Sequence, residues 1–458
     1  MTGSASTSGD SSAIAGAQER AQKLAQLEAD FTRLKGANLT LDLTRGKPAA
    51  EQLSLANALD GILAGDFRAA DGSDTRNYGG IRGLPEACAL GAALLDADPA
   101  DVLTFDNSSL MLMYLYIETA LREGLHGPQS AWQREADSRA GRVKFLCPVP
   151  GYDRHFAICA QLDIEMVNVP IGPTGPDMDR IEALVQQDPL IKGIWCVPKH
   201  SNPTGCTYDE ATVRRFAALP QLAGANFCIM WDNAYAVHDL AEPVALAPLL
   251  KLAKALGTAD AVCMTTSSSK ITFAGGGISF LATSPANQAA FEKRLAVMTI
   301  GPDKVNQLRH VRLLPDLAAV RRHMDLQAAL LRPKFQLVQQ RLEQGLRRDT
   351  AGHPTGQPIA LPTGNRLHAD VDWTHPSGGY FISLNTQPGC AREVVRLAGE
   401  LGVKLTPAGA TFPYGRDPSD SNIRIAPSFP VLADLERAVD VLVLCVRLAH
   451  ARKEPAHS

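Results

Sequence analysis

Between about residues 60 and 300, short apolar runs alternate with stretches of helical periodicity. This alternation is typical of an α/β fold with a mostly parallel sheet. Several of the runs are apolar throughout, as expected for strands that helices cover on both faces. We therefore expect a large domain of three layers, α/β/α, with strands at Val102–Phe105, Val143–Cys147, Ile164–Val169, Gly193–Val197, Phe227–Trp231, Ala261–Met264 and Ile278–Ala282.

The pattern changes after residue 300. Residues 304–346 read as one long helix, which Pro333 should interrupt and kink because proline lacks the backbone N–H and its ring clashes with the preceding turn. A loop rich in Gly, Pro and His (351–378) leads to a smaller α+β domain. It has strands within 380–386 and 403–407, the segment "NIRIAPSF" (422–429), and helices near 390–401 and from about 432.

We accordingly predict four parts along the chain. They are a disordered tail (1–12), an N-terminal segment (13–60), the large domain (61–318) and the small domain (319–458). The N-terminal segment has a helix near 17–34 and should pack with the small domain, and the long helix links the two domains.

The amino-acid composition argues against several classes of protein. Of the 458 residues, 45% are hydrophobic and 20% charged, and the net charge of −3 favours neither nucleic acid nor an anionic membrane as a partner. The nine cysteines include no CxxC pair, so we expect reduced thiols and neither a disulfide framework nor a metal site. No apolar run approaches the roughly 20 residues of a membrane span, and the first residues lack the apolar core of a signal peptide. The expected location is the cytoplasm.

Polar motifs follow the predicted strands: "DNSS", "PVPGY", "SNPTG", "DNAY" and "TSSSK". Open α/β sheets bind their ligands at the carboxyl ends of the strands. The sequence therefore predicts an active site at this edge.

Lys270 in "TTSSSK" is the main chemical candidate. It is not a P-loop lysine, because no glycine precedes it and Ile271 stands where Ser or Thr is required; "RGKP" at 45–48 fails as well. Two interpretations remain, a solvated surface lysine or an amine that forms a Schiff base with an aldehyde.

If that aldehyde is pyridoxal phosphate, its ring nitrogen requires a carboxylate. Asp232 follows a predicted strand and fits this role, although a loop acid or a helix cap is the simpler interpretation. Tyr235 and Asn202 are candidate donors to the phenolate oxygen of the ring, with packing and a β-turn as their alternatives. Tyr152 has two interpretations, stacking on the ring or packing.

A phosphate group would need a cup of donors. Asn107, Ser108 and Ser109 precede the helical run 110–121, where free amides and the helix dipole attract anions; a plain N-cap serine is the alternative. Ser267 and Ser269 carry further hydroxyls. Arg424 lies among apolar neighbours in "NIRIAPSF" and needs a carboxylate partner, which is either a substrate or an internal acid.

Taken together, "SNPTG", "DNAY", "SSSK", "NIRIAPSF" and "NYGGIRGLPE" resemble the fold-type I pyridoxal-phosphate aminotransferases over nearly the whole chain after residue 35. "DLTRGKP", "WDNAYAVHDL", "TTSSSKITFAGGGISF" and "LRPKF" are similar to a bacterial aspartate aminotransferase subgroup related to the effector domain of MocR-type regulators.

The resemblance implies a role for each candidate. Lys270 would carry pyridoxal 5'-phosphate and shuttle the proton, Asp232 would pair with the ring nitrogen, and Asn202 and Tyr235 would hold the ring oxygen. Tyr152 would stack on the ring, and Arg424 would grip the substrate α-carboxylate. Gly46 and Asn202 would contact the substrate, and Tyr78 would reach the phosphate of the other subunit of a homodimer. Phosphate binding would fall to Asn107, Ser108, Ser109, Ser267 and Ser269.

One position departs from the family pattern. Many relatives carry an arginine eight residues after the lysine, and this chain has Ile278 there. The expected function is ping-pong transfer of an amino group from an L-amino acid, with L-aspartate favoured, to 2-oxoglutarate. Another amino donor, a pyridoxal-dependent lyase and a non-catalytic ligand sensor are the alternatives. Arg45, Lys47 and His238 are the candidate partners for a second substrate carboxylate.

Overall fold

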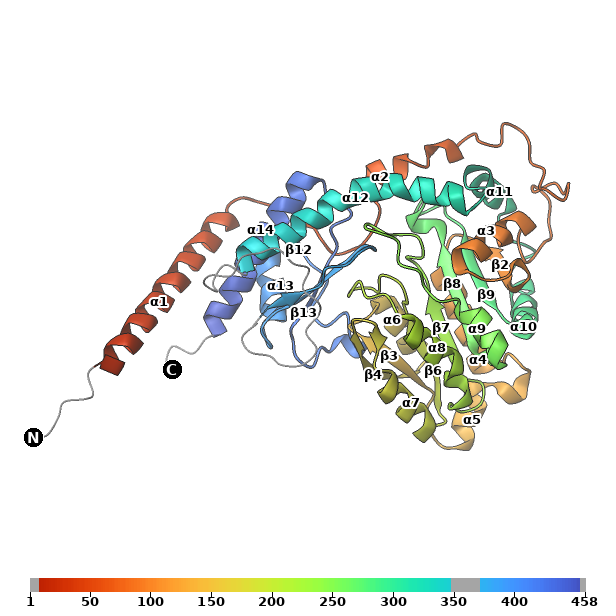
Figure 1. Cartoon of the computed structure of the whole chain (residues 1–458), viewed down its shortest axis with the longest axis horizontal. Helices are drawn as coiled ribbons and strands as arrows, with labels where there is room; N and C mark the ends of the chain where they lie inside the picture. Colours follow the sequence, from red (N-terminus) through yellow and green to blue (C-terminus); the bar gives the residue numbers. More distant parts are fainter. Residues whose placement is uncertain (1–7, 347–370, 454–458) are drawn as a thin grey trace, which may run out of the picture.

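The computed structural model describes residues 8–346 and 371–453. Figure 1 shows a larger lobe around a twisted sheet and a smaller lobe, with α12 running along both. The helices are α1 Ser8–Lys35, α2 Ala50–Ser54, α3 Pro85–Leu95, α4 Ser109–Arg122, α5 Trp132–Ser138, α6 Asp153–Gln161, α7 Met178–Gln187, α8 Glu210–Ala218, α9 Leu249–Leu256, α10 Pro285–Ala296, α11 Lys304–Leu313, α12 Leu317–Leu346, α13 Ala391–Glu400 and α14 Leu432–Lys453.

The central sheet has eight strands in the order β2-β9-β8-β7-β6-β3-β4-β5. Strands β8, β7, β6, β3 and β4 pair in parallel, whereas β9 pairs antiparallel with β8 and β2, and β5 antiparallel with β4. The sheet is therefore mostly parallel, as predicted, and each predicted strand overlaps an observed one: β2 Val102–Phe105, β3 Lys144–Val149, β4 Glu165–Gly172, β6 Ile191–Cys196, β7 Cys228–Asp232, β8 Val262–Ser267 and β9 Ser279–Thr283. The short strand β5 (Gly175–Pro176) was not predicted.

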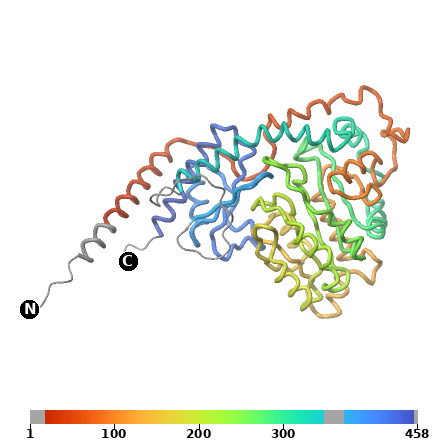
Figure 2. Tube along the Cα trace, in the orientation of Figure 1, coloured from red at the N-terminus to blue at the C-terminus, as the bar shows by residue number. Residues whose placement is uncertain are grey.

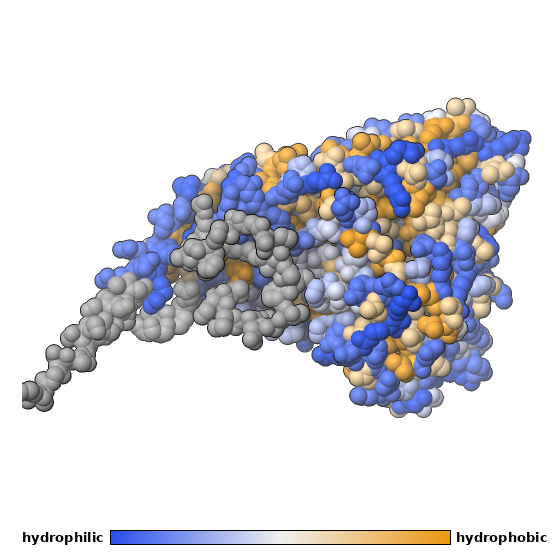
Figure 3. Space-filling model, viewed as in Figure 1, coloured by the Kyte–Doolittle hydropathy of each residue, from blue (hydrophilic) through white to orange (hydrophobic). Residues whose placement is uncertain are grey.

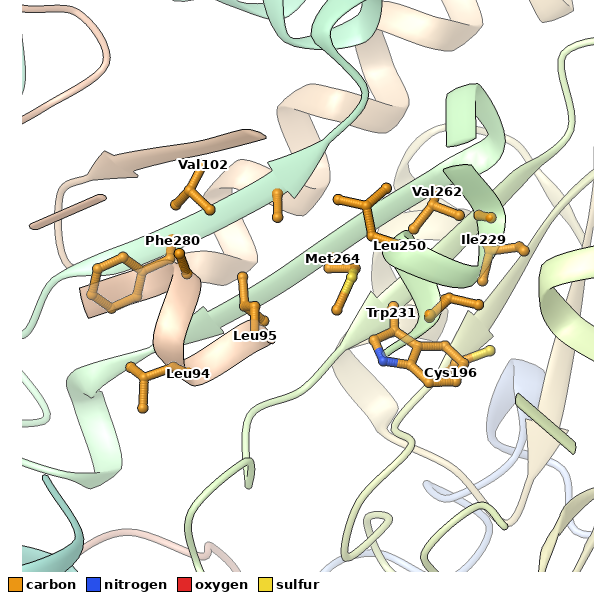
Figure 4. Close-up of a cluster of buried hydrophobic side chains, with 14 of the residues drawn as sticks. Leu94, Leu95, Val102, Cys196, Ile229, Trp231, Leu250, Val262, Met264 and Phe280 are labelled. Atoms are coloured by element: carbon orange, nitrogen blue, oxygen red, sulfur yellow. The ribbon is translucent and has the colours of Figure 1, made fainter. Parts of the chain in front are cut away.

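Alternate residues of the central strands enter two different cores, one on each face of the sheet. In β7, Ile229 and Trp231 pack toward the face that α3 and α9 cover (Figure 4), whereas Cys228 and Met230 pack toward the face of α4 and α6. Because side chains alternate across a strand, a strand that is apolar at every position must be covered on both sides. The three-layer α/β/α architecture follows from this pattern.

The smaller lobe has its own hydrophobic core. It is built on a three-stranded antiparallel sheet, β10 (Asp372–Trp373), β11 (Ile382–Asn385) and β13 (Asn422–Ile425), and on a parallel pair, β1 (Leu41–Asp42) and β12 (Val403–Lys404). Leu27 and Phe31 of α1 and Leu41 of β1 belong to this core, and α1 lies against α14 (Figure 2). The N-terminal segment thus buries its apolar residues among those of the C-terminal part.

Helix α12 contributes to both lobes: Val320 and Met324 pack in the core of the larger lobe, and Phe335 and Val338 in that of the smaller one. The predicted interruption at Pro333 is wrong, because α12 continues through it. The break lies instead at Pro315, between α11 and α12, where the preceding Leu314 leaves the helical region (φ −126°, ψ 69°), as residues before proline tend to do.

Two further expectations differ from the structure or fall outside it. Helix α1 begins at Ser8, inside the stretch 1–12 that was expected to be a disordered tail. Most of the predicted loop 351–378 lies outside the described residues. In the described ranges, no helix is long and apolar enough to cross a membrane. The face in Figure 3 mixes hydrophilic and hydrophobic residues, with hydrophobic ones gathered along its upper edge.

Candidate active site

Three neighbouring parallel strands deliver the central residues of the site. Strand β7 ends at Asp232, β8 ends at Ser267 and leads through a single 3₁₀ turn to Lys270, and β6 leads to the loop that holds Asn202. Because β6, β7 and β8 are parallel and adjacent, their carboxyl ends meet at one edge of the sheet. The strand order thus brings together residues that are as far apart in sequence as Asn202 and Lys270.

These residues line a cavity of about 220 Å³. Residues from the smaller lobe and from the N-terminal segment complete its wall. The predicted site residues on the wall are Gly46, Ser109, Tyr152, Asn202, Asp232, Tyr235, Ser267, Lys270 and Arg424.

Lys270 lies in an environment that suppresses its charge. Burial lowers the pKa of its amine, and the nearby Asp232 carboxylate opposes this only in part. Its Nζ atom is 5.1 Å from the centre of the Tyr235 ring. Its backbone carbonyl accepts hydrogen bonds from the Tyr380 hydroxyl at 3.4 Å and from His238 Nε2 at 3.3 Å. The lysine is therefore held by its main chain, while its amine has the lowered pKa that a nucleophile or a base requires.

Asp232 has one carboxylate oxygen held and one free. Its Oδ2 atom is 3.0 Å from Nε2 of His155, and both side chains are buried. Its Oδ1 atom is also buried and has no hydrogen-bond partner among the described residues. Unpaired buried acceptors are rare because they forfeit solvation without compensation. A protonated ring nitrogen would satisfy this oxygen, so the wall fits the ring of pyridoxal phosphate.

Aromatic rings hold His155 in position. Its imidazole stacks on Trp195 with the ring centres 4.1 Å apart and the planes 5° from parallel, and the Tyr152 ring meets it edge-on at 5.0 Å. Burial and the neighbouring Asp232 raise the pKa of the Tyr152 phenol to about 12, so this ring is neutral. The three rings form a layer beside the carboxylate.

Arg424 is buried and already has an internal carboxylate partner. Its Nη1 atom is 3.0 Å from Oδ1 of Asp153 and 3.3 Å from Oδ1 of Asn202. Its Nη2 atom donates to the Thr44 carbonyl and to the Thr406 hydroxyl at 3.4 and 3.3 Å. Of the two partners that the sequence left open, the internal acid is thus present. The other partner, a substrate carboxylate, would have to compete with Asp153 for Arg424.

The expected phosphate cup is only partly assembled on the wall. Ser109 and Ser267 line the cavity, whereas Asn107, Ser108 and Ser269 do not. The Ser108 hydroxyl accepts from the Met111 amide and so caps α4, which is the simpler of its two interpretations. The Ser269 hydroxyl donates to the Asn107 carbonyl, and the Asn107 amide donates to the Gly275 carbonyl.

Ile278 cannot take the place of a phosphate-binding arginine. Its side chain is 1% exposed and packs in the core of the larger lobe, and its amide donates to the Ser268 hydroxyl at 2.9 Å. The amides at the start of α4, where Ser109 lines the cavity, supply partial positive charge.

Two candidates lie away from the cavity. The Tyr78 side chain is 82% exposed. His238 is buried, and burial together with the charge of Lys270 lowers its pKa to about 3. It is therefore neutral, and it does not line the cavity, so it cannot bind a second substrate carboxylate. Of the three residues considered for that role, Arg45 and Lys47 do line the wall.

The backbone of Gly46 passes close to an aromatic ring of the wall. A Cβ atom at Gly46 would lie 2.5 Å from Phe381, whose ring packs 4.9 Å from the Arg424 guanidinium. Glycine is therefore required for this approach, which brings the "RGK" segment against the Arg424 site.

Several residues of the site were not predicted from the sequence, above all Asp153, His155 and Phe381. His155 had a usable signal, since it stands three residues after Tyr152 in the first turn of a helix, where residues three apart share a face. Asp153 and Phe381 had none. The contact of the two lobes places Asp153 beside Arg424, and the pairing of β11 with β13 in the smaller lobe brings Phe381 there.

The chain is similar to known proteins over nearly its whole length. Residues 15–457 match the family described as aspartate amino-transferase. The chain is 42% identical over 423 residues to an aspartate aminotransferase of Corynebacterium glutamicum, covering 92% of each chain.

Solved structures of aminotransferases superpose on this chain. An aspartate transaminase from C. glutamicum superposes with a TM-score of 0.86 at 40% identity, covering 95% of this chain and 97% of that one. An α-aminoadipate aminotransferase from Thermus thermophilus, solved with N-(5'-phosphopyridoxyl)-L-leucine, shares the fold with a TM-score of 0.71 at 19% identity, covering 90% and 93%. The chain belongs to the aspartate aminotransferase family, with the fold-type I architecture that its sequence motifs indicated.

Proposed function

We propose that the protein is a pyridoxal-5'-phosphate-dependent aminotransferase that moves an amino group from L-aspartate to 2-oxoglutarate. One observation supports it above the others: a buried carboxylate oxygen of Asp232, which has no partner in the described part of the chain, shares a small cavity with a lysine of lowered pKa, Lys270. These are the two groups that pyridoxal chemistry demands of a protein. The C. glutamicum relatives, named for aspartate, support the choice of substrate.

When bound, the cofactor would supply an electron sink for the pair of electrons left at the substrate Cα. The chain's own residues would do the rest. Asp232, held by His155, would keep the ring nitrogen protonated. Asn202 and Tyr235 would donate to the ring oxygen, Tyr152 would cover one ring face, and Ser109 and Ser267 would bind phosphate, with Asn107, Ser108 and Ser269 supporting this cup. Lys270 would take the proton from the substrate Cα and return one at C4′ of the cofactor.

The charges around the cavity favour a substrate with two carboxylates. Arg424 would bind the α-carboxylate, with Asn202 and Gly46 beside it. Arg45, Lys47 and Arg154 also line the wall, and none of the three forms an ion pair with another described residue. Unpaired cations at a cavity attract anionic ligands. Arg45, Lys47 and Arg154 are therefore the candidates for the side-chain carboxylate.

We further propose a homodimer in which Tyr78 reaches the phosphate of the other subunit. Exposed apolar side chains gather near it: Val297, Met298 and Ile300 are 79%, 52% and 66% exposed. Gly301 lies against Gly79, and Lys304 donates to the Tyr78 carbonyl, so the two segments adjoin. Exposed apolar patches of this kind mark interaction sites.

The decisive experiment incubates the holoenzyme with L-aspartate and 2-oxoglutarate. Aminotransfer yields glutamate without ammonia or carbon dioxide, in ping-pong kinetics. Ammonia or carbon dioxide as the main product would identify a lyase. Binding of the cofactor with no turnover of any donor in a screen of amino acids would favour a ligand sensor.

A further inference from the structure

The carboxylate of Asp153 is bound where a substrate carboxylate would have to bind. Its Oδ1 atom is 3.0 Å from Nη1 of Arg424, and both side chains line the cavity. Asp153 is the first residue of α6, directly after Tyr152, so the helix start projects it toward the arginine of the smaller lobe.

The hydrogens of Arg424 leave little room for a second carboxylate. Nη1 has two N–H groups, and Asp153 and Asn202 accept from both. Nη2 faces Thr44 and Thr406, and Nε is buried without a partner among the described residues. A two-point grip on a carboxylate requires two parallel N–H groups. An entering carboxylate that uses Nη1 and Nη2 must therefore displace Asp153.

This exchange is physically easy. The Arg424 side chain is 6% exposed and needs a negative partner at all times, because an uncompensated buried charge is strongly unfavourable. Asp153 is 34% exposed, so its carboxylate regains water once it is released. One carboxylate replaces another on the same guanidinium, and the buried charge stays compensated.

We propose that Asp153 is a built-in competitor for the α-carboxylate subsite, which sets the affinity of the enzyme for every carboxylate substrate. The proposal rests on the assignment of Arg424 under the proposed function. Asp153 occupies Arg424 between turnovers, weakens binding of amino acid and 2-oxo acid alike, and leaves the choice of side chain to other residues. It is a positioning residue, since it acts through Arg424.

The test uses the holoenzyme and two simple probes, propionate and succinate. We expect Asp153→Asn to lower the dissociation constants of both, measured by calorimetry and as competitive inhibition, by the same factor of about three to ten. KM for 2-oxoglutarate should fall in parallel, with a much smaller change in kcat. Asp153→Ser, which also removes the charge, repeats the test if the asparagine variant folds poorly.

Asp179→Asn is the matched control. Asp179 also lies in the first turn of a helix and pairs with an arginine, Arg215, at 2.6 Å, but it does not line the cavity. It should leave both constants unchanged. Unchanged or weaker probe binding in both Asp153 variants would overturn the proposal. A wild-type enzyme without turnover would instead count against the proposed function, and calorimetry would still report on Asp153.

Discussion

Nε2 of His155 lies 3.0 Å from Oδ2 of Asp232, with both side chains buried. This contact orients the carboxylate so that its other oxygen, Oδ1, remains available for a ligand. The stacking of His155 on Trp195 fixes the imidazole in turn. His155 therefore positions the Asp232 carboxylate, and a substitution of His155 should change how Asp232 binds its ligand.

We expect His155→Phe to keep the ring packing and lose the hydrogen bond. The affinity for pyridoxal phosphate and kcat should each fall by about tenfold, as for a lost hydrogen bond to a charged group. His155→Gln, which retains a donor, should recover part of both. His126→Phe, at an exposed histidine, is the control. A smaller loss in His155→Phe than in His155→Gln would show that ring packing matters and the hydrogen bond does not; cofactor titration and steady-state kinetics decide.

Replacing the lysine should separate cofactor binding from turnover. Lys270→Ala should still bind pyridoxal phosphate through Asp232 and the serines, but its turnover should fall by about 10²–10⁴-fold because no positioned amine moves the proton at Cα. Cofactor absorbance and glutamate formation measure the two effects. Lys251→Ala, at a surface lysine paired with Asp96, is the control. Full activity in Lys270→Ala would refute the assignment.

The preference for dicarboxylates should depend on the cations at the wall. If Arg45 or Lys47 binds the side-chain carboxylate, its replacement by methionine should lower kcat/KM for aspartate by about tenfold to a hundredfold, the value of a hydrogen bond between charged groups. The value for alanine as donor should change little. Comparing the two donors in each variant identifies the residue. Equal losses for both donors would contradict a specific role.

The apolar patch near Tyr78 should hold a dimer together. Ile300→Asp places a charge in this patch and should shift the protein toward monomers in light scattering, with a parallel loss of activity because the shared site is incomplete. Leu256→Asp, at another exposed apolar residue, on α9, should leave the oligomeric state unchanged. A dimer that withstands Ile300→Asp, or a wild-type monomer with full activity, would argue against a shared site.

Buried histidines should make the fold sensitive to acid. The unfolded chain binds a proton at His238 below about pH 6.5, whereas burial lowers the folded pKa to about 3, so the histidine stays neutral in the fold. The unfolded state therefore binds more protons between these values. The free energy of unfolding should decrease as the pH falls through this window, by at most about 1.4 kcal/mol per pH unit for this residue.

Urea unfolding at pH 7.5 and pH 5.5 tests this dependence. His238→Gln carries no titrating group and should lose less stability between the two pH values than the wild type. His126→Gln, at an exposed position, should behave like the wild type. Parallel losses in His238→Gln and the wild type would mean that His238 does not contribute to the acid sensitivity.

The sequence by itself determined the strands of the central sheet apart from β5, the edge of the sheet that carries chemistry, and nine of the residues that line the cavity. These follow from local signals: apolar runs long enough for a strand, and polar motifs directly after them. Lys270, Asp232 and Asn202 were found in this way, because each stands at or just after the end of its own strand and the carboxyl ends of parallel strands must meet.

The tertiary structure decided what depends on contacts between distant segments. It paired Arg424 with Asp153, brought His155 to Asp232, and turned His238 away from the cavity. It also ended the helix at Pro315 and let α12 pass through Pro333. In each case the local sequence allows more than one outcome, and contacts made in the folded chain select one. They lie within the larger lobe for His155 and Asp232, and between the two lobes for Arg424 and Asp153.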